Sequence, residues 1–288
     1  MPQDFRCRVV ALGIQQTHQR KAQVPGLRQY ESGQNSLFGA SENIKKELKT
    51  SAWRKSSVQG VPIVMNRDAT SETYVSRPIT IPADGVQLEG MLVIPPRAKG
   101  VVVFAHGIGS SRHSPRNNFV AQKLHEAGVG TLLMDLLTKA EDTIYENRFD
   151  IDFLTWRLER ATQWLMEQPE ARPLDIGYFG ASTGAAAALN AAATFGAAIG
   201  AVVSRGGRPD LTMASLDRVQ CPTLLIVGGL DDVVIELNRQ AYEKLKTEKH
   251  LAIVPGATHL FEEPGTLQEV ARLASHWFHR CLGRKREV

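Results

Sequence analysis

Short apolar runs alternate with helical patterns along most of this chain, and this alternation constrains its fold more than any other feature. Runs typical of strands lie at 78–82, 86–94, 100–105, 130–136, 174–179, 199–204, 222–227 and 250–254. Helical patterns lie at 115–128, 149–167, 185–193, 236–247 and 265–282. Strands that alternate with helices form parallel β-α-β units. The sequence therefore predicts an α/β fold, with a doubly wound, mostly parallel sheet of about eight strands and helices on both faces.

The segment Gly180-Ala181-Ser182-Thr183-Gly184 joins a strand-like run to an Ala-rich helical run. This G-x-S-x-G spacing between a strand and a helix is typical of a nucleophile elbow, a sharp turn that projects the serine hydroxyl from the edge of a sheet. Small residues on either side of the serine allow strand and helix to pass closely. We therefore expect Ser182 to act as a nucleophile, which needs a base within hydrogen-bond reach because a serine hydroxyl is weakly nucleophilic at neutral pH.

Other chemically useful residues also follow the carboxyl ends of expected strands. His106 follows 100–105, Asp231 follows 222–227 and His259 follows 250–254. In open α/β sheets, sites form at this edge. We expect His259 to be the base and Asp231 to hold its imidazole, with Asp232 as the alternative acid. His106 is expected to be structural.

These motifs resemble those of α/β-hydrolases in the dienelactone-hydrolase-like group, and more narrowly of bacterial hydrolase domains sometimes joined to phosphoribosyltransferases. The resemblance runs from about Arg77 to Leu282. It rests on residues 106–117, the elbow at Ser182, and residues 204–210, 231 and 259–264. It implies an α/β-hydrolase fold and favours Asp231 over Asp232, because family members place the acid three residues after the first glycine, here Gly228. Dienelactone hydrolases proper use a cysteine nucleophile where this chain has Ser182, so lactone chemistry is not carried over.

The surroundings of the expected nucleophile suggest two further sets of residues. Backbone N–H groups of Ile108 and Thr183 are the expected oxyanion hole. Four arginines on nearby loops are candidate substrate-binding residues, because guanidinium groups suit carboxylates and phosphates: Arg112, Arg116, Arg205 and Arg208. Two interpretations stay open. The arginines could bind an anionic substrate, as dienelactone hydrolases hold a substrate carboxylate, or they could pair with acids such as Asp135 and Asp210 and brace the loops.

The segment between strands 199–204 and 222–227 is too short for a cap domain, so we expect an open site. Residues 137–148 are a candidate rim loop beside it. The function expected from these features is a serine hydrolase that cleaves a carboxylic ester or related acyl bond through an acyl-Ser182 intermediate. A thioesterase, acyltransferase or peptidase could use the same residues, and a non-catalytic ligand-binding protein could keep the same fold.

Charge separates the first part of the chain from the rest. Residues 1–76 hold 11 Lys and Arg against 6 Asp and Glu, which leaves 23 against 24 for residues 77–288. We expect a basic, partly disordered N-terminal extension over 1–70 and a catalytic domain over 71–288. Met65 is an alternative start. The extension has no aromatic-basic interleaving, so no nucleic-acid partner is expected.

The cysteines and the apolar runs of the sequence bear on the expected cofactors and cellular location. Three cysteines without a C-x-x-C pair suggest neither a disulfide framework nor a zinc site, and they suit a reducing compartment. No apolar run approaches the ~18 residues that would span a membrane. We expect a cytoplasmic enzyme with a small-molecule acyl substrate and no metal or cofactor, and a homodimer is left open.

Overall fold

The computed structural model describes residues 73–283. By its internal contacts the chain divides into two units, Met1–Met65 and Asn66–Val288, and the described residues belong to the second. The expected extension over 1–70 lies outside the described residues, so its boundary stays a prediction.

The second unit is built on one eight-stranded sheet with the order β1-β2-β4-β3-β5-β6-β7-β8. The strands are β1 (Val75–Ala83), β2 (Val86–Ile94), β3 (Gly100–Ala105), β4 (Gly130–Met134), β5 (Asp175–Ala181), β6 (Ile199–Arg205), β7 (Thr223–Gly228) and β8 (Lys249–Val254). β1 and β2 are antiparallel, β2 is antiparallel to β4, and all pairs from β4 to β8 are parallel. The predicted doubly wound, mostly parallel sheet is confirmed.

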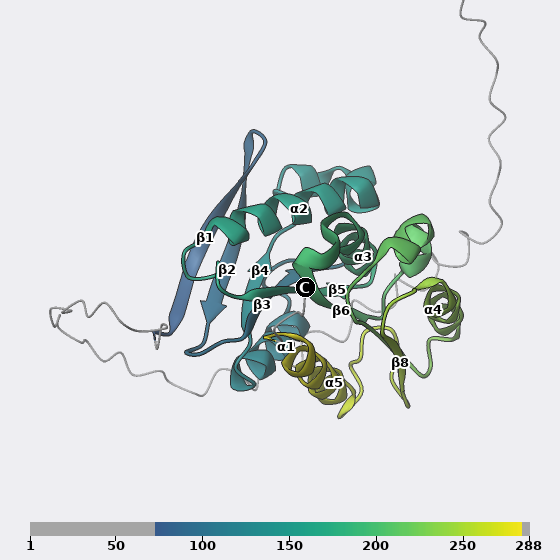
Figure 1. Cartoon of the computed structure of the whole chain (residues 1–288). Helices are drawn as coiled ribbons and strands as arrows, with labels where there is room; N and C mark the ends of the chain where they lie inside the picture. Colours follow the sequence, from purple (N-terminus) through teal and green to yellow (C-terminus); the bar gives the residue numbers. More distant parts are fainter. Residues whose placement is uncertain (1–72, 284–288) are drawn as a thin grey trace, which may run out of the picture. The chain divides into compact units, whose positions relative to one another are not determined.

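Helices cover both faces of the sheet. They are α1 (Pro115–Glu126), α2 (Ile151–Glu167), α3 (Thr183–Phe195), α4 (Asp232–Lys244) and α5 (Thr266–Cys281). Figure 1 shows α2 and α3 on one face and α1 and α5 on the other. The helix expected at 236–247 begins earlier, at Asp232, because Val234 and Ile235 bury their side chains against the end of β7.

Two cores on opposite faces explain why the central strands read as continuous apolar runs. In β3, Val101 and Val103 lie in the core beneath α2 and α3, whereas Val102 and Phe104 lie in the core with α1 and α5. A strand buried on both faces needs apolar residues at every position.

Local signals in the sequence account for two of the connections. The β1–β2 hairpin turns at Asp84 and Gly85, both with positive φ (41° and 87°), the geometry that an Asp-Gly pair favours. α1 begins with Pro115 at its first turn, and the Ser114 side chain accepts a hydrogen bond from the Asn117 N–H. Both features agree with the sequence.

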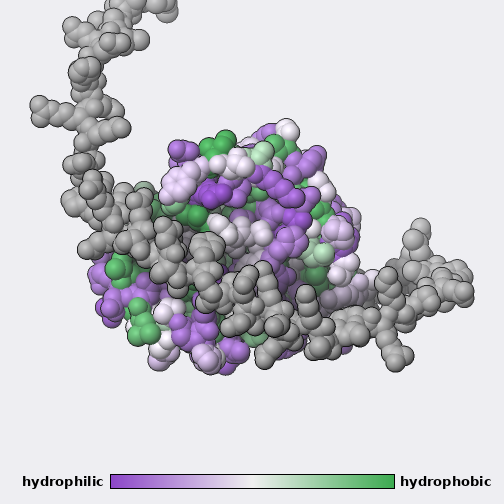
Figure 2. All heavy atoms as spheres, turned by 180° about the vertical axis from the view of Figure 1, so that it is seen from behind, coloured by the Kyte–Doolittle hydropathy of each residue, from purple (hydrophilic) through white to green (hydrophobic). Residues whose placement is uncertain are grey.

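The connection from β6 to β7 holds a single 3-10 helix, η7 (Pro209–Arg218), and no cap domain, as expected. Within residues 73–283, none of the helices combines the length and the apolar character that crossing a membrane requires. On the face shown in Figure 2, hydrophobic residues lie singly or in small groups among hydrophilic ones where the surface is visible.

Candidate active site

Ser182 occupies a strained backbone position between β5 and α3. Its φ is 52° and its ψ is −122°, a conformation that non-glycine residues adopt rarely. A Cβ on Gly180 would lie 2.4 Å from the Ala185 Cα, and one on Gly184 would lie 2.2 Å from the Ala105 carbonyl oxygen. Only glycine fits at either position, so these two residues let the strand, the helix and β3 converge beneath the serine.

The side chain of His259 contacts the side chains of both Ser182 and Asp231. The His259 Nε2 lies 3.4 Å from the Ser182 Oγ, and the His259 Nδ1 lies 2.6 Å from the Asp231 Oδ2. Because the carboxylate accepts the Nδ1 proton, the Nε2 lone pair faces the serine hydroxyl. Asp231 is 12% exposed and His259 35% exposed, so the acid is sheltered while the base reaches solvent. The structure places Asp231, and not Asp232, against the imidazole.

The expected oxyanion donors flank the serine. Thr183 is the first residue of α3, so its N–H has no partner within the helix and lies at the positive end of the helix dipole. The loop that carries Ile108 passes close to the elbow, because a Cβ on Gly107 would lie 3.0 Å from the Ser182 Cβ. The assignment of Ile108 and Thr183 to an oxyanion hole stays a prediction that this geometry permits.

His106 ties the loop of Ile108 to the end of β4. Its Nδ1 lies 3.0 Å from the Gly107 carbonyl oxygen, and its Nε2 accepts a hydrogen bond from the Leu136 N–H at 3.0 Å. The Nδ1 therefore carries the proton. Burial lowers the pKa of His106 against the opposing effects of the Gly107 carbonyl and of Asp135 and Asp142. A neutral imidazole that bridges two backbone groups suits the structural role that the sequence suggests.

Three of the four candidate arginines are paired with carboxylates. Arg112 forms ion pairs with Asp135 and Glu89, and Arg208 donates two hydrogen bonds of 2.8 Å to Asp210. Arg116 donates to Glu262 at 2.9 Å. The interpretation in which arginines brace the loops fits these three pairings. Nothing in the local sequence around Glu89 or Glu262 marks either residue as the partner of an arginine so distant in the chain.

Arg205 differs from the other three. Its side chain is buried, with 8% of the residue exposed, and among the described residues its guanidinium has neither an ion pair nor a hydrogen bond. It lies over the ring of Phe261, 5.9 Å from the ring centroid. Burial, together with the charge of Arg116, lowers the pKa of Arg205 to about 10, which leaves it protonated at neutral pH. A buried cation without a partner is costly, so this is the arginine whose surroundings fit an added anion.

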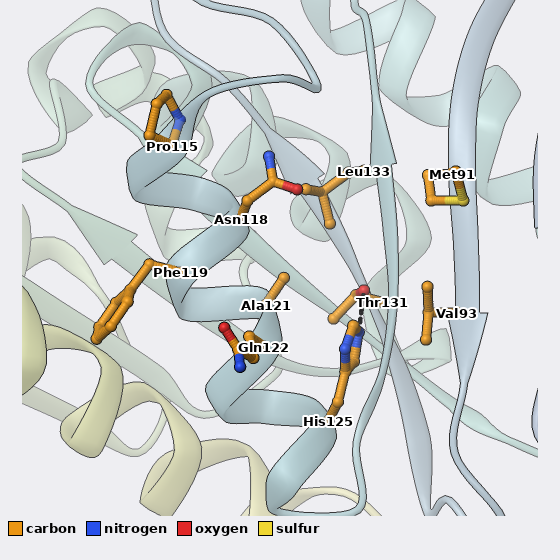
Figure 3. Close-up of a pocket in the computed structure, with 10 residues that line it drawn as sticks. All are labelled: Met91, Val93, Pro115, Asn118, Phe119, Ala121, Gln122, His125, Thr131 and Leu133. Atoms are coloured by element: carbon orange, nitrogen blue, oxygen red, sulfur yellow. Dashed lines mark hydrogen bonds between the residues drawn. The ribbon is translucent and has the colours of Figure 1, made fainter. Parts of the chain in front are cut away.

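A separate groove lies between α1 and the strands β2 and β4 (Figure 3). Its one titratable side chain, His125, bonds Thr131 through Nε2 and Oγ1 at 2.7 Å. The other lining residues are Met91, Val93, Pro115, Asn118, Phe119, Ala121, Gln122 and Leu133. It holds no carboxylate to orient the histidine, and the Thr131 hydroxyl is fully buried, so it offers no catalytic arrangement. Within residues 73–283, no cluster of His, Cys, Asp and Glu could hold a metal ion.

Comparison with known proteins supplies the family. The model of the dienelactone hydrolase family matches residues 88–282. The chain belongs to this family. A crystal structure of a dienelactone hydrolase from Anabaena variabilis is 53% identical, with a TM-score of 0.71, and the match covers 73% of this chain and 99% of that one. The resemblance expected from the motifs is confirmed, and this dienelactone hydrolase family member has the α/β-hydrolase fold.

Three further matches show how much of the chain resembles known proteins. Proteins of Mycobacterium tuberculosis described as putative phosphoribosyl transferases are 55% identical over 205 residues, which is 70% of this chain and 46% of theirs. The family member thus spans less than half the length of these curated relatives. A structure from Xanthomonas campestris, described as an α/β serine hydrolase without lid, is 20% identical with a TM-score of 0.59, and the match covers 73% of this chain and 96% of that one. This last likeness shows the fold alone.

Proposed function

We propose that this family member is a serine hydrolase that cleaves a carboxylic ester or related acyl bond through an acyl-Ser182 intermediate. One observation carries the proposal. The Ser182 hydroxyl, the His259 imidazole and the Asp231 carboxylate are joined by contacts of 3.4 Å and 2.6 Å at the carboxyl edge of the sheet. The first distance is long for a hydrogen bond, but such contacts are often longer before substrate binds.

The arrangement supports a two-step acyl transfer. His259 takes the proton of the Ser182 hydroxyl while the Oγ attacks the carbonyl carbon, and the negative oxygen faces the N–H groups of Thr183 and Ile108. The carbon–oxygen bond to the leaving group breaks as His259 returns the proton to that oxygen. Water then attacks the acyl-enzyme with His259 again as the base, which releases the acid and restores Ser182. Asp231 keeps the imidazole in the required tautomer and stabilises its charged form.

The same steps serve a thioesterase, an acyltransferase or a peptidase. The β6–β7 connection carries no cap, so water has access to the acyl-enzyme, and this favours hydrolysis over transfer to another acceptor. A non-catalytic ligand-binding protein is the alternative from another class. Cytoplasmic location and the lack of cofactor and nucleic-acid partners stay predictions from the sequence, and assembly as a homodimer stays open.

Pre-steady-state hydrolysis of p-nitrophenyl acetate tests the proposal. We expect a burst of about one p-nitrophenolate per chain, followed by slower turnover, because acylation by an activated ester outpaces deacylation. A ligand-binding protein would release p-nitrophenolate no faster than the buffer alone, and that result would contradict the proposal.

We infer further that the substrate carries a negative charge that Arg205 binds. The support is the buried guanidinium, which has no ion pair or hydrogen bond among the described residues, on a residue whose backbone adjoins the elbow, since the Ser182 N–H donates to the Arg205 carbonyl oxygen at 3.1 Å. Arg112, Arg116 and Arg208 already have carboxylate partners, so Arg205 is the member of the set that we assign to substrate.

Replacement of Arg205 by methionine tests this inference, since methionine keeps the volume next to Phe261 and removes the charge. We expect kcat/KM for p-nitrophenyl hemisuccinate to fall about 10- to 100-fold more than that for neutral p-nitrophenyl butyrate, the range for hydrogen bonds to a charged group. Arg208→Met is the matched control and should leave the ratio between the two esters unchanged. Equal losses on both esters in Arg205→Met would reject a role in charge recognition.

A further inference from the structure

In the connection between β4 and α2, several half-buried polar side chains hydrogen-bond one another, while three large apolar side chains are exposed. Thr138 bonds Glu141 through its N–H and hydroxyl at 2.8 and 2.9 Å, and Asn147 donates to the Glu141 carbonyl oxygen at 2.9 Å. Arg148 donates to the Asp142 carbonyl oxygen at 2.8 Å. In contrast, Ile144, Tyr145 and Phe149 are 51%, 64% and 47% exposed. We call these three exposed residues the apolar platform.

Contacts with α2 anchor the loop that carries the platform. Glu141 forms an ion pair with Arg157 of α2, whose guanidinium also donates to the Ala83 carbonyl oxygen at 2.7 Å. The rings of Tyr145 and Phe149 lie with their centroids 4.8 Å apart at an interplanar angle of 45°. Exposed aromatic side chains on an anchored loop lose little freedom on binding, so they form a preorganised contact surface.

This loop adjoins the segment that is expected to bind the oxyanion. Asp142 and Arg148 line a narrow crevice together with Ile108 and Gly109. In the sheet, β4 is separated from β5, which leads into Ser182, by β3 alone. The platform therefore lies at the carboxyl ends of the strands, as Ser182 does, and on the β4 side of the expected oxyanion hole.

Exposed apolar side chains gather at this edge of the sheet more than elsewhere. Of eleven large apolar residues that are exposed in the described part of the chain, eight follow the carboxyl ends of strands: Ile108, Ile144, Tyr145, Phe149, Leu211, Leu230, Val233 and Leu260. The other three are Tyr74, Met91 and Ile253. Within residues 73–283 no cap covers this edge, so these side chains are available to a substrate, and exposed apolar surface that gathers beside a site is typical of a binding surface.

We propose that the apolar platform binds a bulky apolar or aromatic group of the substrate, so that such esters are hydrolysed in preference to acetyl esters. This inference rests on the proposed ester hydrolysis and names the substrate class for the same site. Removal of apolar area from water and contact between aromatic rings supply the attraction. An acetyl group offers little apolar area to such a surface, whereas a phenylpropanoyl or octanoyl group offers much more.

The test compares a platform variant with a matched control in the full chain. Tyr145→Ser/Phe149→Ser removes the aromatic pair, and Met91→Ser/Ile253→Ser removes two apolar side chains that are exposed elsewhere. For each protein, kcat/KM is measured with p-nitrophenyl acetate, octanoate and 3-phenylpropanoate, and with phenyl and 2-naphthyl acetate to separate the acyl side from the alcohol side. All ester concentrations stay below those at which micelles form.

In the wild type, we expect the larger esters of at least one series to be preferred over the smaller ones about 10-fold. The platform variant should lower that preference about 10-fold, and the control should keep it. An unchanged preference in the platform variant, or an equal fall in the control, would overturn the inference. So would a platform variant that converts a dimer to a monomer with unchanged selectivity, since the platform would then contact a second copy of the chain. If the wild type hydrolysed none of these esters, that result would instead contradict the proposed ester hydrolysis.

Discussion

Replacement of Ser182 by alanine is expected to lower kcat for p-nitrophenyl acetate by at least about 10⁴-fold, because it removes the atom that attacks the carbonyl carbon. The remaining rate would come from binding and from the oxyanion donors alone. Alanine tolerates the backbone conformation of Ser182 about as well as serine does, so the fold should persist. Steady-state kinetics and thermal unfolding of the purified variant measure both expectations.

The control for this loss is Ser215→Ala, which removes a hydroxyl from the 3-10 helix η7 and should retain the wild-type rate. Activity within about tenfold of the wild type in Ser182→Ala would show that ester hydrolysis, if present, uses another nucleophile. A variant with no activity and a collapsed unfolding temperature would be replaced by Ser182→Cys, which keeps a nucleophile at the same position.

Replacement of Asp231 by asparagine is expected to lower kcat/KM by about 10³- to 10⁴-fold. The Asp231 Oδ2 lies 2.6 Å from the His259 Nδ1 and accepts its proton. An asparagine amide can present an N–H there instead, which favours the tautomer whose Nε2 carries the proton and cannot take one from Ser182. The carboxylate that stabilises the imidazolium is lost as well. The readout is kcat/KM with p-nitrophenyl acetate between pH 6 and 9.

The neighbouring acid supplies a closely matched control. Asp232 is the first residue of α4, whereas the partner of the His259 imidazole is Asp231, so Asp232→Asn should change kcat/KM by less than about threefold. A large loss in Asp232→Asn with a small loss in Asp231→Asn would reverse the assignment of the acid.

Local sequence signals predict the elbow and its neighbours well. The strand–Gly-x-Ser-x-Gly–helix unit, the Asp-Gly hairpin and the Ser-Pro start of α1 each depend on a few adjacent residues, and the structure contains all three. The meeting of Ser182, Asp231 and His259 follows from the rule that parallel strands end at the same edge of a sheet. Both the local motifs and the convergence of the three side chains can therefore be inferred from the sequence alone.

Features that depend on distant residues could not be predicted from the sequence in the same way. The ion pair of Arg116 with Glu262 joins residues 146 positions apart, and the guanidinium of Arg205, at the end of β6, lies over Phe261 from the loop after β8. The outward orientation of Tyr145 and Phe149 belongs to a 3-10 segment without a period that separates inside from outside. The sequence indicates a rim loop at 137–148, but only the pairing of its polar groups reveals which side chains it exposes.

The acyl-enzyme itself is the most direct test of the account. The protein would be mixed with p-nitrophenyl butyrate, quenched with acid during the burst and digested, and the peptides would be analysed by mass spectrometry. The account predicts one butyryl group per chain, attached to Ser182, and no such group in the Asp231→Asn protein quenched at the same time. A burst without an acyl group on Ser182, or with the acyl group on a cysteine or another serine, would contradict it.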